Sequence, residues 1–209
     1  MRKFLAASVA VLLFCSAVFA QKTKTKAILG FKAGVNISTF RTAVDYPDFD
    51  VSFKLGQVFG AFVQIPVCAS RFTIQPEFLY SQLGAKASST LWGDATFRYN
   101  YFSIPVLVKY NVAKGFDVLA GLESDILIRG QLKQIDKTTT VTYDMNDFDF
   151  AYTAGFSAYS KQWVFDMRYI HGSQDASPVA DVNTLYNQAV QITLGYKLLP
   201  KAKKAKTAK

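Results

Sequence analysis

Side-chain polarity alternates with a period of two residues along most of this 209-residue chain, and this pattern constrains the fold more than any other feature. Successive side chains of a β-strand point to opposite faces, whereas a helix repeats every 3.6 residues. The alternation recurs in eight segments, near residues 29–37, 58–65, 72–81, 101–110, 116–123, 149–158, 163–170 and 190–197. The sequence therefore predicts an all-β fold with eight antiparallel strands.

The two faces of these segments differ in charge and in bulk. One face is rich in Phe, Tyr and aliphatic residues and has no charged residue. The other face combines Gly and Ser with the charged residues Lys32, Glu77, Lys109, Asp117, Glu123, Asp149, Asp166, Arg168 and Lys197. The interior of an eight-stranded barrel is only just wide enough for side chains, so the bulky face fits the outside. A Lys or Arg at mid-bilayer on a lipid-facing surface costs about 2–4 kcal/mol. The split therefore predicts an eight-stranded antiparallel transmembrane β-barrel.

Inside such a barrel, the nine charged residues are expected to form a network of ion pairs, because an unpaired buried charge is costly. A small channel lined by the same residues is the alternative, although so narrow a barrel leaves little lumen. A soluble periplasmic barrel with the apolar face inward, lining a lipid cavity, is a second architecture with the same alternation.

The connections between the segments alternate in length. The joins near 67–70, 111–114 and 160–161 are short, whereas 39–53, 87–97, 129–147 and 171–186 are long. Outer-membrane barrels have short periplasmic turns and longer extracellular loops, and an even strand count places both termini in the periplasm. Pro76 and Pro105 fall inside predicted strands, where the missing N–H predicts local bulges.

The chain begins with a basic and apolar leader. Arg2 and Lys3 precede an apolar run that ends at Phe19, which predicts a secretory signal peptide cleaved between Ala20 and Gln21. An uncleaved anchor is the alternative, but the run is shorter than the roughly 20 residues of a spanning helix. The predicted organisation is a signal peptide at 1–20, a barrel domain at 21–200 and a Lys-rich periplasmic tail at 201–209.

The net charge of +9 resides mainly at the two ends. Two cations lie in the leader and five Lys lie in 201–209, so the barrel domain is nearly neutral. This distribution, together with export from the cytoplasm, disfavours nucleic acid as a partner and favours outer-membrane lipids. The tail is expected to be a solvated end, with adhesion to anionic head groups or cell-wall polymer as the alternative.

No motif for a cofactor or metal is present in the sequence, so neither is expected. The single histidine, His171, lies near Ser173, Asp175 and Ser177, residue types that form nucleophilic triads. A triad is recognised by geometry, however, and no nucleophile motif accompanies these residues. We therefore expect a protein that is not an enzyme, with a lipid-modifying barrel enzyme as the alternative.

Several phrases resemble the PorT-like family of outer-membrane β-barrel proteins: GFKAGVNIS (30–38), FTIQPEFLYSQLGAK (72–86), YNYFSIPVLVKYN (99–111), FDMRYIHG (165–172) and QITLGY (191–196). The resemblance spans about 27–198. It implies an eight-stranded barrel in the outer membrane of a Gram-negative cell. The family's named member takes part in protein secretion and gliding-associated export. The resemblance thus implies a secretion or envelope protein partner, bound through the extracellular loops or the periplasmic side.

Overall fold

The computed structural model describes residues 27–42, 49–67, 71–89, 93–134, 137–139, 148–173 and 185–199. The predicted signal peptide and the Lys-rich tail lie outside these ranges. Eight long strands are β1 (Ile28–Thr42), β3 (Lys54–Val67), β4 (Phe72–Leu83), β6 (Gly93–Ala113), β7 (Phe116–Gln134), β9 (Phe148–Ser160), β10 (Trp163–Gly172) and β11 (Leu185–Leu198). Three short strands are β2 (Phe49–Ser52), β5 (Lys86–Ser89) and β8 (Lys137–Thr139). No helix within the described residues is long and apolar enough to cross a membrane.

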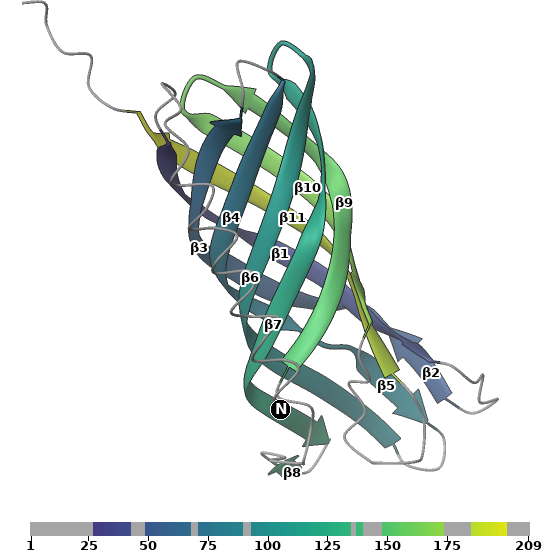
Figure 1. Cartoon of the computed structure of the whole chain (residues 1–209). Helices are drawn as coiled ribbons and strands as arrows, with labels where there is room; N and C mark the ends of the chain where they lie inside the picture. The colour runs from purple at the N-terminus through teal and green to yellow at the C-terminus, as the bar shows by residue number, and fades with distance from the viewer. Residues whose placement is uncertain are drawn as a thin grey trace, which may run out of the picture.

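The eight long strands close into an antiparallel barrel. They follow the order β6-β4-β3-β1-β11-β10-β9-β7, and pairing of β6 with β7 closes the ring. The first long strand pairs with the last, from Leu29 opposite Leu198 to Thr42 opposite Leu185. Figure 1 shows the strands strongly tilted around a common axis. The predicted eight-stranded antiparallel barrel is thus confirmed.

The bulky apolar face points away from the barrel axis. Phe31 is 55% exposed, Leu122 57% and Leu194 52%, although each belongs to a fully paired strand. All nine predicted interior charged residues are buried. This orientation contradicts the soluble alternative, in which the apolar residues would line a cavity. Where a large ring does turn inward, a glycine makes room for it: a Cβ on Gly30 would lie 2.3 Å from the Phe62 ring.

One end of the barrel has tight connections, and we call it the turn end. Residues 114–115 join β6 to β7, and residues 161–162 join β9 to β10. Gly115 has a φ of +82°, a left-handed value that glycine adopts without steric cost. Lys161, in the other tight turn, has a φ of +50°. The opposite end, the loop end, contains the long connections.

The long connections hold more strand than the sequence predicts. β2 lies within 39–53 and β8 within 129–147, and β5 overlaps the start of 87–97. β6 already begins at Gly93 and β7 continues to Gln134. The short strands extend the barrel wall in the order β2-β5-β6-β7-β8, at the lower end in Figure 1. We call these three strands, with residues 93–100 of β6 and 129–134 of β7, the loop-end extension.

The two strand prolines do not produce the predicted bulges. Pairing with β7 is continuous through Pro105, which lies opposite Glu123. On the other side of β6, pairing with β4 is interrupted between Pro76–Val106 and Leu79–Ser103, with no change of register. Near Pro76, pairing with β3 is interrupted between the Phe62–Glu77 and Ile65–Ile74 pairs, but no residue is inserted. The bulge prediction was wrong because a missing N–H removes one ladder bond without requiring an extra residue. The irregularities of the β6–β7 pair occur instead at Asn100/Tyr101 and Asn111/Ala113.

Candidate functional site

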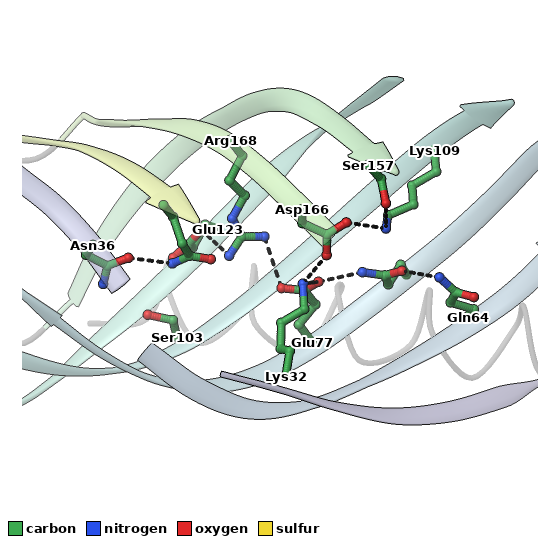
Figure 2. Close-up of polar contacts among 12 residues, drawn as sticks. Lys32, Asn36, Gln64, Glu77, Ser103, Lys109, Glu123, Ser157, Asp166 and Arg168 are labelled. Carbon is green, nitrogen blue, oxygen red and sulfur yellow. Dashed lines mark hydrogen bonds and ion pairs between the residues drawn. The ribbon is translucent and has the colours of Figure 1, made fainter. Parts of the chain in front are cut away.

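The middle of the lumen contains a continuous chain of buried ion pairs, drawn in Figure 2. Lys32 Nζ lies 2.7 Å from Glu77 Oε1 and 2.6 Å from Asp166 Oδ2. Asp166 Oδ1 lies 3.0 Å from Lys109 Nζ. Arg168 bridges two acids, with Nη1 3.0 Å from Glu77 Oε2 and Nη2 3.5 Å from Glu123 Oε2. We call these six residues the ion-pair chain.

The ion-pair chain crosses the full width of the barrel. Arg168 lies on β10 and Glu77 on β4, which are four positions apart in a ring of eight strands. These two strands are therefore diametrically opposite. Lys32, Lys109 and Glu123 lie on β1, β6 and β7. Asp166 lies on β10 with Arg168, so side chains from five of the eight strands meet in the lumen. An arrangement of this kind bridges the lumen and does not line it.

Neutral polar side chains surround the ion-pair chain. Lys109 Nζ donates to Ser157 Oγ at 3.0 Å, and Gln75 Nε2 donates to Glu77 Oε1 at 2.6 Å. Gln64 Nε2 donates in turn to Gln75 Oε1 at 2.9 Å. At Glu77 and Lys109, these bonds satisfy oxygens and ammonium protons that the ion pairs alone leave free, which is a condition for burying such charges. The carboxylate oxygens of Glu123 have no hydrogen-bond partner among the described residues.

The structure brings six of the nine predicted charged residues into the ion-pair chain and leaves three elsewhere. Asp117 accepts from Asn111 Nδ2 at 2.7 Å, and Asp149 accepts from Asn187 Nδ2 at 3.2 Å. The Lys197 ammonium lies 4.7 Å from the centre of the Tyr159 ring. Asp117 and Lys197 are at the turn end, whereas Asp149 is toward the loop end.

Two further buried charges were missed by the sequence analysis. Asp125 accepts a short hydrogen bond from Ser103 Oγ inside the barrel. It continues the same alternation as Asp117 and Glu123, so a longer predicted strand would have included it. Lys54 is also buried, and its Nζ contacts the carbonyls of Leu55 at 3.4 Å and Leu83 at 3.5 Å. The predicted segment began at residue 58, so the sequence analysis did not place Lys54 in a strand.

Between the ion-pair chain and the loop end, apolar side chains form a cluster in the lumen. We call this cluster the apolar layer; it consists of Phe40, Leu83, Ala85, Tyr99, Tyr101, Ala151, Ile170 and Ala189. The Phe40 and Tyr99 ring centres are 5.7 Å apart, as are those of Phe40 and Phe97. Asn187 Nδ2 donates to Tyr101 Oη at 3.2 Å, from β11 across to the opposite strand β6. A second bridge thus crosses the lumen here.

The turn end, by contrast, is open. A polar cavity of about 380 Å³ lies there, lined by Gln64, Arg71, Thr73, Asn111, Asp117, Tyr159 and Lys197. The ion-pair chain lies between this cavity and the apolar layer. The lumen therefore consists of a polar mouth, a charged middle and an apolar end.

None of these groups forms a recognisable reaction centre. No cluster of three or more His, Cys, Asp or Glu residues that could hold a metal occurs in the described part of the chain. The ring of His171 lies 6.3 Å from that of Tyr169, and Ser173 Oγ donates to the Phe150 carbonyl. Asp175 and Ser177 lie outside the described residues. The geometry thus adds no nucleophile–base pair to the sequence hypothesis.

Comparison with known proteins places the barrel in a family. The family described as "Outer membrane protein beta-barrel domain" matches residues 19–175, so the chain belongs to this family. None of the curated proteins matches the sequence. The fold is similar to that of Neisserial surface protein A, with a TM-score of 0.54 and 7% identity over 82% of this chain and 99% of that one. Ail, the attachment invasion locus protein of Yersinia pestis, covers 83% of this chain and 99% of its own, with 12% identity and a TM-score of 0.47.

The family and the fold together define an outer-membrane β-barrel protein. The exposed apolar band of the eight strands then faces lipid. Since barrels of this class have short turns on the periplasmic side, the turn end faces the periplasm and the loop end faces the cell exterior. The polar cavity accordingly opens to the periplasm, and the apolar layer lies toward the exterior.

Proposed function

We propose that this protein is a non-conducting outer-membrane barrel that serves as a structural or interaction component of the envelope and carries out no catalysis. The observation that carries the proposal is a pair of bridges across the lumen. Arg168 contacts Glu77 in the middle, and Asn187 contacts Tyr101 nearer the loop end. A conduit needs a continuous hydrated path, and these contacts interrupt it at two levels. Function then resides at the two ends and on the outer wall.

Conductance in a planar lipid bilayer tests this proposal. The refolded full-length mature protein is expected to insert without current steps, while a porin inserted under the same conditions serves as the positive control. Insertion is verified separately by protection of the barrel from protease. Stable, voltage-independent current steps from the purified protein would contradict the proposal and favour the small-channel alternative.

A role in protein secretion is the finer proposal that the PorT-like resemblance supports. The partner would bind the loop-end extension or the periplasmic mouth, because loops at the ends of a rigid barrel are where recognition residues concentrate. Deletion of the gene is expected to leave exported cargo in the periplasm, measured by comparing the proteins of the medium and the periplasm. Unchanged cargo distribution, with the barrel's absence verified, would reject the secretion role.

We also propose that residues 1–20 direct export and are removed before Gln21, and that 201–209 form a periplasmic tail after the barrel domain. The intact mass of protein purified from the outer membrane tests the cleavage. A mass that includes residues 1–20 would favour the uncleaved anchor.

A further inference from the structure

The outward face of β6 changes character along its length. From Phe102 to Tyr110 every second residue is apolar and points to lipid, whereas Thr96, Arg98 and Asn100 continue the same outward column. The inward column changes in the opposite sense, from Lys109 and Ser103 to the buried Tyr101 and Tyr99. A tilted spanning strand needs about 9–11 residues, which is the length of the apolar stretch. The hydrocarbon boundary of the outer leaflet therefore lies near 100–102.

Just beyond this boundary, the outward face of the loop-end extension is basic. Lys86 lies opposite Thr96, which lies opposite Lys133, so these residues form one row across β5, β6 and β7. Two residues nearer the membrane, Arg98 lies opposite Gln131, and in the next row after that Arg129 lies opposite Asn100. Residues directly opposite in a ladder share a face. Lys86, Arg98, Arg129 and Lys133 thus make one patch, which we call the basic patch, and all four side chains are exposed.

Carboxylates do not neutralise the basic patch within the described part of the chain. All five ion pairs observed there lie inside the barrel. The acids on this face, Asp50 and Asp94, lie in the next row away from the membrane, and Asp94 accepts a 2.5 Å hydrogen bond from Ser88. Behind the patch, the buried Lys54 ammonium contacts only carbonyl oxygens among the described residues. The exposed basic patch is therefore complementary in charge to an anionic ligand.

We propose that the basic patch binds the phosphate groups of a phosphate-bearing glycolipid in the outer leaflet. The direction of the side chains favours a lipid over a soluble ligand: they extend the lipid-facing column and so project sideways, at the depth where head groups begin. Arg presents a planar fork that matches phosphate oxygens, and Lys adds a point charge. The site would hold annular glycolipid at β5–β7. This inference is independent of whether the lumen conducts.

Native mass spectrometry of the detergent-solubilised full mature chain tests the proposal, with lipid A and its dephosphorylated form as probes. The unmodified protein is expected to retain lipid A and to release the dephosphorylated lipid. The triple variant Arg98→Gln/Arg129→Gln/Lys133→Gln removes three surface cations and is expected to weaken retention about a hundredfold. The matched control Arg71→Gln/Lys114→Gln/Lys161→Gln removes three cations at the periplasmic end and is expected to retain the lipid.

Two results would overturn the proposal. Equal retention of both lipids by the unmodified protein would exclude phosphate recognition without reliance on any variant. Tight binding of soluble polyphosphate with no retention of lipid A would assign the patch to a soluble polyanion. A slower-migrating boiled band for each variant verifies that it folds, so loss of lipid cannot be attributed to misfolding.

Discussion

The membrane-embedded part of β6 and its loop-end extension have opposite polarity in the same strand. In the bilayer, the outward side chains are apolar, such as Val106, and the inward ones include Lys109. In the extension, Arg98 points outward, whereas the buried Tyr99 points inward. The backbone pairing with β7 is continuous across the change apart from one bulge. The surrounding solvent, and not the strand, decides which face is apolar.

The two interiors differ for the same reason. The extension and the loop end are surrounded by water, so they bury an apolar layer as a soluble protein does. The membrane section already has an apolar outer surface in hydrocarbon, and its interior holds apolar side chains such as Phe62, Leu79 and Leu107 together with the ion-pair chain. Its interior can hold charges, provided that they are paired across the lumen. The comparison predicts different penalties for similar substitutions in the two sections.

The largest effect is expected in the ion-pair chain. Glu77→Gln removes the acid that joins Lys32 to Arg168, and breaking a buried pair in this way typically costs about 3–5 kcal/mol. The free energy of unfolding in lipid vesicles, followed in urea by electrophoretic mobility, measures the loss. The control Asp94→Asn, on the exposed face of the extension, is expected to unfold at the same urea concentration as the unmodified protein. An unchanged midpoint for Glu77→Gln would mean that the ion-pair chain is not a stabilising plug.

A Lys substitution along the outward column of β6 gives the next largest effect. Val106→Lys places a cation in the hydrocarbon and is expected to lower the free energy of unfolding by about 2–4 kcal/mol. Thr96→Lys, in the same column beyond the boundary, is expected to leave it unchanged. The same urea titration compares the two variants. Equal losses at both positions would contradict the position of the boundary.

The smallest effects are expected in the apolar layer, where two tyrosines differ in hydrogen bonding. Tyr101 Oη accepts from Asn187, whereas buried Tyr99 Oη has no hydrogen-bond partner among the described residues. Tyr101→Phe is therefore expected to destabilise by about 1 kcal/mol, and Tyr99→Phe to stabilise by a similar amount. Thermal unfolding, with band mobility as the readout, separates the two. The same sign for both variants would contradict the assigned hydrogen bonds.

The barrel was predictable from sequence because the alternation encodes the face of each residue directly. The eight strands and the inward placement of Lys32 and Glu77 follow from the two-residue period of the sequence. The pairing of Lys32 with Asp166 does not, because these residues are 134 positions apart and meet only through closure of the ring. The ends of β6 and β7 were also missed. The outward face of β6 becomes polar at Asn100, so a rule that equates outward with apolar ends this strand at the membrane boundary. The predicted segment of β7 ended at Glu123, although the outward Ile126 continues its alternation.

The most direct test of this account is a scan of spin labels along β6. Single cysteines at positions 96, 98, 100, 102, 104 and 106, in a Cys68→Ser background, carry a nitroxide in lipid vesicles. Accessibility to oxygen reports hydrocarbon, and accessibility to a water-soluble nickel complex reports solvent. Labels at 96 to 100 are expected to be accessible to nickel, and labels at 102 to 106 to oxygen. Nickel accessibility at all six positions would contradict the lipid-facing barrel.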